Sequence, residues 1–476
     1  ETTWVLTSYL VANAVILPMS GWFSSLMVRK RFYLTCVTLF TVSSVLCGLA
    51  PSLGWLIFFR VLQGLGGGGL QPTAQALLME NFPPEKHGQA MAVYGMGVVF
   101  APVIGPVLGG WLTDNFSWRW IFLINLPVGI LSFALSSALL SDPPFLKRIS
   151  LKSGRIDYIG FGLIALGLGA LEIVLDEGQR HDWFASPFIV AFAIVGVLAI
   201  ILVVFNELRH EHPVVNLRLL KNGNFATSSI LLLFLGFVLY GSTFLIPLFL
   251  QTLLGFDATT SGLALSPGGI VILVTMPFVG MLVRKVDPRW LMGYGLFTTG
   301  LGLFMMSHYS LDTGLGDAVV ARMVQSLGLA ALFIPTNVAA YSSLKHEEIG
   351  QASGLLNLFR NFGGSMGIAM LSTLLARRTQ FHQARLVEHL APGQPAYEGF
   401  VGRIAHSLAQ QGYSALDALH RAQAMLYGRT LQQARLLAFT DVFWVAAIIC
   451  FALILGLLLL RKSKVDARLV EEAMAE

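Results

Sequence analysis

Two charged side chains stand inside long apolar stretches. Arg60 lies in the stretch 54–79, and Glu172 is the one carboxylate well within an apolar stretch, at 156–176. A charge at the centre of a membrane helix costs roughly 3 kcal/mol on insertion scales, so such groups usually face a bundle interior or a watery cavity. Ionisable groups in that setting can bind and release protons. We therefore take Arg60 and Glu172 as candidates for proton coupling.

A second set of polar and aromatic residues interrupts otherwise apolar helices. Mixtures of amides and aromatic rings suit flat, amphipathic, cationic or uncharged compounds. Each residue could instead serve helix packing, and Arg360 could reach the membrane surface. As candidates to line a substrate cavity we take Asn13, Gln63, Gln71, Gln75, Tyr94, Phe237, Tyr240, Phe244, Gln251, Asn337, Asn357, Arg360 and Asn361.

A glycine-rich run, GMGVVFAPVIGPVLGG at 95–110, lies between Gln89 and Asp114 with no charged residue in between. Small residues at every fourth position leave one helix stripe without side chains, so a neighbouring helix can approach closely. Prolines inside a helix bend it. The run therefore predicts a packing seam formed by Gly97, Ala101, Pro102, Gly105, Pro106, Gly109 and Gly110.

Composition places these groups in a membrane. The chain has 476 residues, of which 55% are hydrophobic and only 12% charged, and its mean hydropathy is +0.70. These values exclude an ordinary soluble protein and predict an all-α polytopic membrane protein. The three cysteines lie in apolar runs, which argues against a metal site or a disulfide framework. There is no Walker A pattern, so we expect no cofactor and a proton gradient as the energy source.

We read thirteen apolar spans, each long enough to cross a bilayer: 4–27, 32–50, 54–79, 88–113, 119–140, 156–176, 185–207, 225–252, 260–284, 289–309, 316–343, 349–376 and 438–461. Basic residues cluster in alternate connections, which indicates topology rather than nucleic-acid binding and places these connections and the C-terminus in the cytoplasm. The chain begins at Glu1 without a methionine, and we expect a missing N-terminal segment.

An internal repeat with an offset of 262 residues predicts the architecture. Its members are Arg60, Gln63, Leu65 and Gly66, which recur as Arg322, Gln325, Leu327 and Gly328, and Gly88, Gln89 and Ala90, which recur as Gly350, Gln351 and Ala352. Arg322 falls in the fourth span of the C-terminal half, but Arg60 falls only in the third span of the chain. We therefore expect two six-span halves related by repetition, with the first span absent.

The expected divisions of the chain follow from these spans. They are an N-terminal helical bundle at 1–140, an inserted helix pair with linkers at 141–224, the first five spans of a C-terminal bundle at 225–376, an exterior domain at 377–437, a last span at 438–461 and a cytoplasmic tail at 462–476.

Several stretches resemble one family. The seam resembles the antiporter motif of major facilitator drug:proton antiporters, with Ala101 in place of a glycine, and LIFFRVLQGLGGGGLQP from Leu56 resembles their arginine-containing motif. LDEGQRHDWF from Leu175, HPVVNLRLLKNGNF from His212 and FHQARLVEHLAP from Phe381 resemble the EmrB-like exporters of the fourteen-span EmrB/QacA type. The first loop departs from the pattern: Ser25 stands where many members have Asp, and Val28 where they have Gly.

The resemblance implies a major facilitator fold, with two inserted helices between the bundles and fourteen spans of which this chain holds thirteen. It implies a multidrug exporter of the bacterial inner membrane that exchanges hydrophobic or amphipathic compounds for protons. It also implies that 377–437 docks a periplasmic adaptor joined to an outer-membrane channel. In the family, the usual partner of Arg60 is an acidic residue in the first span, which this sequence does not contain.

Two other functions stay open at this point. One is export of a single endogenous metabolite, such as a fatty acid or a siderophore. The other is a membrane enzyme or receptor on a transporter-like fold. An enzyme would need a convergent nucleophile, acid/base or metal constellation, and we find no such constellation in the sequence. Gly363-x-Ser365-x-Gly367 fits a nucleophile elbow, but it lies inside a span.

Overall fold

The structure is a computed structural model that describes residues 4–140, 157–210, 213–342, 344–390 and 393–457. Every regular element in these ranges is a helix, so the all-α prediction is confirmed. The linker at 141–156 and the predicted tail at 462–476 lie outside the described residues.

All thirteen predicted spans correspond to helices. Ten helical segments of the described chain are long and apolar enough to cross a membrane. The other three predicted spans, 88–113, 289–309 and 349–376, coincide with α4, α12 and α14. The helices are α1 (Trp4–Met27), α2 (Arg29–Gly48), α3 (Leu53–Asn81), α4 (His87–Asn115), α5 (Trp120–Leu123), α6 (Asn125–Leu139), α7 (Tyr158–Glu177), α8 (Pro187–Arg209), α9 (Gly223–Thr252), α10 (Ala258–Leu263), α11 (Ser266–Leu282), α12 (Pro288–Met306), α13 (Leu315–Tyr341), α14 (Ile349–Glu388), α15 (Pro395–Gln410) and α16 (Ala415–Gly456).

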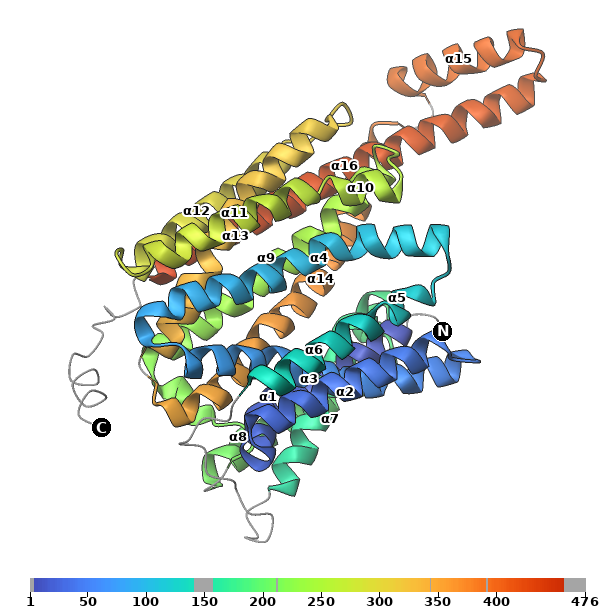
Figure 1. The fold of residues 1–476 in the computed structure, drawn as a ribbon. Helices are drawn as coiled ribbons and strands as arrows, with labels where there is room; N and C mark the ends of the chain where they lie inside the picture. The colour runs from blue at the N-terminus through green and yellow to red at the C-terminus, as the bar shows by residue number, and fades with distance from the viewer. Residues whose placement is uncertain (1–3, 141–156, 211–212, 343, 391–392, 458–476) are drawn as a thin grey trace.

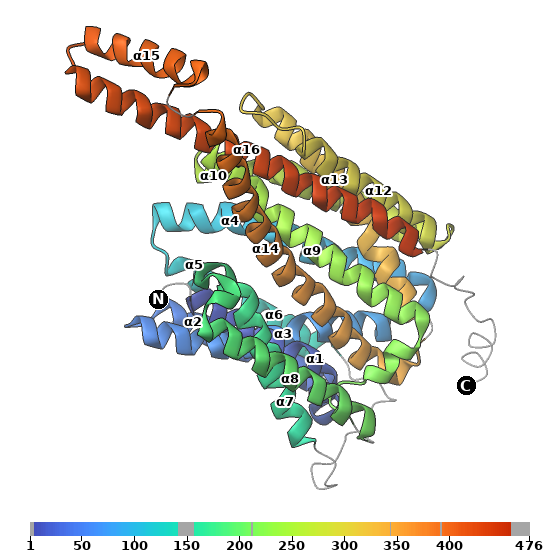
Figure 2. The same ribbon diagram turned by 180° about the vertical axis from the view of Figure 1, so that it is seen from behind.

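The helices gather into two groups (Figures 1 and 2). In the N-terminal half, α3 packs against α1 and α2, and α2 packs against α6. In the C-terminal half, α13 packs against α11 and α12, and α14 packs against α9 and α16. Contacts of α1 with α14 and of α4 with α11 join the halves. The resulting interface is where the cavity-lining side chains must meet.

The inserted helices α7 and α8 pack on each other, and α7 also packs on α1 and α14. Asp157 begins α7 as its N-cap, because its side chain accepts a hydrogen bond of 2.7 Å from the amide of Gly160. The pair therefore touches both halves.

The segment 377–437 is helical in its described part. It comprises the end of α14, the amphipathic α15 and the beginning of α16, and it projects away from both helix groups (Figures 1 and 2). Val401 and Leu408 of α15 are buried, as are Ala418 and Ala422 of α16, since the two helices pack on each other. This apolar face holds the two helices together as a hairpin.

At one end of the bundle, which we call the basic end, lie the connections that carry Arg29, Lys86, Lys221 and Lys285. Here the halves approach to backbone contact. A Cβ atom added to Gly21 of α1 would lie 2.7 Å from Cα of Gln351 on α14, and one added to Gly88 of α4 would lie 2.5 Å from the carbonyl oxygen of Gly280 on α11. Both places require glycine, and the basic end is closed.

A buried ion pair strengthens the same end. Arg29 at the start of α2 donates from Nε to Oε2 of Glu80 on α3 over 2.8 Å, and from Nη1 to Oγ of Ser24 over 2.8 Å. Val28, the single residue between α1 and α2, has φ 68° and ψ 148°, a region that bulky β-branched residues seldom occupy. This is the position where the resemblance predicts glycine, and the tight connection explains why.

Candidate functional site

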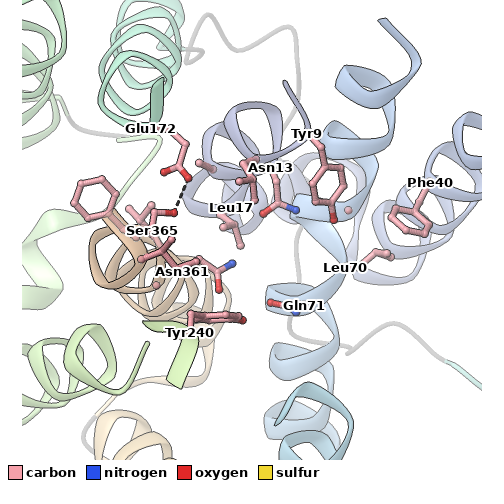
Figure 3. Close-up of a pocket in the computed structure, with 17 residues that line it drawn as sticks. Tyr9, Asn13, Leu17, Phe40, Leu70, Gln71, Glu172, Tyr240, Asn361 and Ser365 are labelled. Atoms are coloured by element: carbon pink, nitrogen blue, oxygen red, sulfur yellow. Dashed lines mark hydrogen bonds between the residues drawn. The ribbon is translucent and has the colours of Figure 1, made fainter. Parts of the chain in front are cut away.

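A cavity of about 380 Å³ opens between the two halves (Figure 3). Its walls come from α1, α2 and α3 on one side and from α9 and α14 on the other, and α7 of the inserted pair adds one residue. Figure 3 shows side chains of both halves pointing into the same space. Relative movement of the halves would therefore change the shape of this cavity.

The lining combines amides and aromatic rings with one acid. Asn13, Gln71 and Asn361 supply the amides, and Tyr9 and Phe40 of the N-terminal half and Tyr240 of the C-terminal half supply aromatic rings. Glu172 is the one ionisable carboxyl group in the lining, and no Lys, Arg or His of the described chain lines it. Such a surface favours cations and neutral compounds with apolar rings.

Glu172 is held in place by the C-terminal half. Its side chain is buried, and Oε1 accepts a hydrogen bond of 2.6 Å from Oγ of Ser365 on α14 (Figure 3). One turn along α7, Asp176 accepts a hydrogen bond from Thr7 of α1. Beyond α7, Trp183 donates from Nε1 to Thr373 of α14 over 3.0 Å. The inserted pair is thus bonded to both halves beside the cavity.

A buried polar network crosses the interface between the cavity and the basic end. Gln75 of α3 donates to Oδ1 of Asn337 on α13 over 2.6 Å and accepts from Asn357 of α14 over 2.6 Å. Arg360 donates to Oε1 of Gln71 and to Oδ1 of Asn357, both over 2.7 Å. Gln75 and Asn337 are 262 residues apart, which is the repeat offset. Equivalent residues of two halves meet only beside their pseudo-two-fold axis, so this bond marks the axis.

The repeated arginines make the same local bond. Arg60 donates from Nη1 to Oε1 of Gln63 over 2.9 Å, and Arg322 donates from Nη1 to Oε1 of Gln325 over 2.7 Å. Arg60 also donates to the carbonyl oxygen of Val5 and lies 4.4 Å from the ring centre of Tyr9. It makes no ion pair within the described residues. Arg60 therefore stands directly behind the cavity wall that Tyr9 forms.

Comparison with known proteins agrees with this architecture. Residues 1–368 match the Major Facilitator Superfamily. The chain belongs to the major facilitator superfamily. It is 34% identical to the multidrug export protein EmrB of Escherichia coli, over 96% of this chain and 87% of that protein. It is also 34% identical to the fatty acid resistance protein FarB of Neisseria gonorrhoeae (95% and 87%) and 32% identical to the colistin resistance protein EmrB of Acinetobacter baumannii (95% and 87%). This places it among the EmrB-type members.

Solved structures share the fold of this major facilitator protein. The proton:xylose symporter XylE aligns with a TM-score of 0.56 at 13% identity, covering 97% of this chain and 86% of that one. The human organic anion transporter MFSD10 aligns with a TM-score of 0.54 at 13% identity, covering 94% and 83%. Family and fold are thus those of multi-pass membrane transporters, which argues against the membrane-enzyme reading.

The structure of this transporter brings some predicted cavity residues together and separates others. Asn13, Gln71, Tyr240 and Asn361 line the cavity. The buried network or its edge holds Gln75, Asn337, Asn357 and Arg360, with Tyr94 donating to the carbonyl oxygen of Gln71. Gln63 lies in the Arg60 network and donates to Ser44.

Three further predicted cavity residues lie neither in the cavity lining nor in these polar networks. Phe237 is buried in the core of the C-terminal half, where Gly367 packs on its backbone. Phe244 and Gln251 lie further along α9 and are exposed. The prediction used residue type alone, and α9 turns these side chains away from the interface.

Sequence reasoning missed Tyr9, Phe40 and Ser365. Helical spacing could have found two of them: Tyr9 precedes Asn13 by four residues, and Ser365 follows Asn361 by four, so each pair shares a helix face. The approach of Ser365 to Glu172 carries no sequence signal, because it joins residues 193 positions apart.

The predicted seam on α4 lies open. A Cβ atom added at Gly97, Gly105, Gly109 or Gly110 would meet nothing within 4 Å in the part of the chain that the structure describes, and Ala101 is exposed. The expected close approach of a neighbouring helix to this stripe is therefore not seen. The side chains of Pro102 and Pro106, expected to bend the helix, lie outside the described residues.

Proposed function

We propose that this protein exports hydrophobic and amphipathic compounds across the inner membrane of a bacterium in exchange for protons, by alternating access of its two halves. The observation that carries the proposal is the cavity between the halves, with its amides, its aromatic rings and the single carboxyl group of Glu172. The kinship with proteins named for multidrug export and for colistin resistance supports the same function.

The distribution of basic residues gives the orientation of the protein in the membrane. By the positive-inside rule the basic end faces the cytoplasm, and so does the C-terminus. With the basic end closed by the contacts of Gly21 and Gly88, the cavity of this conformation belongs to the outward-facing side of the cycle. Cargo would be released from it and protons would enter it.

Glu172 is the proposed proton carrier. A cationic cargo and a proton compete for the same carboxylate, so arrival of one favours departure of the other, which is the requirement for exchange. A carboxylate accepts a hydrogen bond more strongly than a neutral carboxylic acid does, so protonation of Glu172 would weaken its bond with Ser365 between α7 and α14. Arg60, behind Tyr9, would set the electrostatic potential of the opposite wall.

The experiment is drug uptake into inverted membrane vesicles, with a panel of amphipathic compounds and with and without an uncoupler. Wild type should accumulate several compounds, and uncoupler should abolish this. Glu172→Gln should bind cargo yet fail to exchange it for protons. Glu177→Gln, on the same helix but outside the cavity lining, is the matched control. Uncoupler-sensitive uptake by Glu172→Gln at the wild-type rate would rule out Glu172 as the carrier.

We further propose that the segment 377–437 docks a periplasmic adaptor that leads to an outer-membrane channel. The hairpin of α15 and α16 projects from the end opposite the basic end (Figure 2), and α16 continues into the C-terminal half, so a partner bound there would follow its movement. Replacing 380–435 with a short Gly/Ser linker should spare uptake into inverted vesicles but remove resistance in intact cells. Unchanged resistance would place the docking site elsewhere.

A narrower function is export of one endogenous amphiphile. The relative FarB is named for fatty acid resistance, and a siderophore is another candidate of this class. The same substrate panel separates the two functions, because a dedicated exporter would accept one compound and ignore the rest.

A further inference from the structure

A second cavity, of about 220 Å³, lies beside the first. It is lined by the inserted helices α7 and α8 together with α1, α14 and the connection before α9, and every side chain that lines it is apolar. We call it the apolar slot. Its walls include Ile164 and Leu168 of α7, Ile200 and Val203 of α8, and Leu358 and Phe362 of α14.

The slot and the polar cavity are neighbours that share a wall. Leu358 and Phe362, one turn apart on α14, line both spaces. On α7 the adjacent residues Leu171 and Glu172 line the slot and the cavity respectively. A molecule with a polar end beside Glu172 could therefore extend an apolar part past Leu358 and Phe362 into the slot.

The size of the slot and the chemistry of the polar cavity limit the class of molecule that could bind there. Apolar cavities exclude water, and 220 Å³ is less than the roughly 300–1,000 Å³ of pockets that hold a drug-sized molecule, so the slot suits a hydrocarbon chain rather than a ring system. The polar cavity offers a carboxyl group and the aromatic rings of Tyr9, Phe40 and Tyr240, besides the shared Phe362, and its described lining has no basic side chain. That combination recognises a cation.

We propose that the apolar slot holds the alkyl chain of a single-chain cationic amphiphile whose charged end lies in the polar cavity beside Glu172. This inference rests on the proposed export function and names one class of its cargo. It gives the inserted helix pair a role in binding cargo, since α7 and α8 supply six of the thirteen residues that line the slot.

The test measures binding rather than transport. The purified protein in lipid nanodiscs is titrated with hexyl-, octyl- and decyltrimethylammonium, and binding to empty nanodiscs is subtracted. A chain that enters the slot should lower the wild-type Kd by about fourfold for each methylene buried. A flat series would overturn the proposal, because it would mean that the chain stays in the bilayer or that a lipid tail fills the slot.

Two variants one residue apart locate the chain. Ile200→Trp fills the slot from α8, whereas Ile201→Trp points away from the protein, since Ile201 is 47% exposed. Ile200→Trp should bind the hexyl compound as wild type does but lose the gain with chain length, and Ile201→Trp should keep it. If the affinity of Ile200→Trp still rose with chain length, the slot would not be the binding site of the chain. That result would leave the polar cavity untested, because binding of the hexyl compound reports on it separately. Failure of wild type to bind any homologue would refute the cationic cargo, while uptake of neutral drugs tests export separately.

A measurement on the unmodified chain covers the case that Ile200→Trp does not fold. A decyltrimethylammonium analogue with a diazirine at the end of its chain should, on illumination, label the slot-lining residues of α7 and α8, such as Leu168 and Ile200, and residues 355–362. Labelling confined to lipid-facing positions such as Ile201 would contradict the proposal.

Discussion

The two halves carry the same kind of glycine stripe in opposite circumstances. The repeat pairs Ala101 and Gly105 of α4 with Gly363 and Gly367 of α14. On α14 the stripe is packed to contact: Cβ atoms added at Gly363 and Gly367 would collide with the backbone of Leu233 and Phe237 on α9. On α4 the same added atom at Gly105 meets nothing within 4 Å in the described chain. A stripe of small residues thus permits close packing, but the packing occurs only where a second helix lies against the stripe.

The two repeated arginines, Arg60 and Arg322, make the same local bond but have different surroundings. Arg60 and Arg322 each bond a glutamine three residues on, because that bond is made within one helix turn. Their surroundings differ: Arg322 is fully buried and bonds Ser242 and Thr243 of α9, whereas Arg60 is half-buried beside the cavity. The arginine–glutamine bond is thus the same in both halves, whereas the surroundings of each arginine differ. We expect these surroundings to make Arg322 important for stability and Arg60 important for transport.

The largest difference between the halves should come from the stripes. Gly367→Leu forces α9 and α14 apart, and since overpacking of a tight contact costs about 1–3 kcal/mol even before the backbone moves, most of the protein should fail to fold. Gly105→Leu should change stability by less than about 0.5 kcal/mol. Size-exclusion profiles and thermal unfolding of the two variants test this. Equal losses would show that a partner covers the α4 stripe in the membrane.

The arginines should separate stability from function. Arg322→Ala leaves Ser242, Thr243 and Gln325 without their buried donor, so unfolding should become easier by about 1–3 kcal/mol. Arg60→Ala should insert and fold normally but lose proton-coupled export, and Arg60→Lys should keep part of it, because it retains the charge without the planar fork. Thermal unfolding and vesicle uptake, run on the same preparations, give both readouts. Full export by Arg60→Ala would remove Arg60 from the coupling scheme.

Sequence predicted these halves better than it predicted the site. Apolar length fixes each span and the repeat fixes their order, so every span proved to be a helix. The polar cavity was only partly foreseen, because whether Asn13 or Phe237 faces it depends on helix rotation and on contacts between distant segments. Glu172 was identified by its cost in an apolar run, yet its partner Ser365 depends on how α7 docks on α14. The open stripe was missed for the same reason.

A smaller effect should come from the bond at the pseudo-two-fold axis. Gln75→Leu or Asn337→Leu removes the hydrogen bond between equivalent residues of the two halves, at a cost of about 1–3 kcal/mol to the closed basic end. Gln75→Leu also removes the acceptor of the bond from Asn357, whereas Asn337→Leu leaves that bond in place. A cysteine placed at Ser20, buried at that interface, should then react faster with a membrane-impermeant thiol reagent. Both variants should raise this rate, Gln75→Leu the more because it breaks two bonds, and an unchanged rate in Asn337→Leu would argue against an axial role.

The smallest effect concerns the connections at the basic end. Val28 alone joins α1 to α2 with φ 68°, while five residues, Val283 to Asp287, join α11 to α12. Backbone strain of that kind costs about 1–3 kcal/mol. Replacement by glycine relieves the strain, but the larger conformational entropy of glycine in the unfolded chain offsets about 0.5–1 kcal/mol of that gain. Val28→Gly should therefore stabilise by about 1 kcal/mol, seen as a higher Tm. Lys285→Gly, in the longer connection, should bring no gain.

The glycines that close the basic end have one more consequence. At Gly88 and Gly280 the two halves touch through main-chain atoms, and a Cβ atom added to Gly88 would lie 2.5 Å from both the carbonyl oxygen of Gly280 and Cγ1 of Val283. A single added methyl group would therefore force the two halves apart at this contact. Gly88→Ala would hold the halves ajar at this end and arrest the cycle in one state, without an inhibitor or an antibody, and so offers a genetic means of capturing the opposite conformation for structural work.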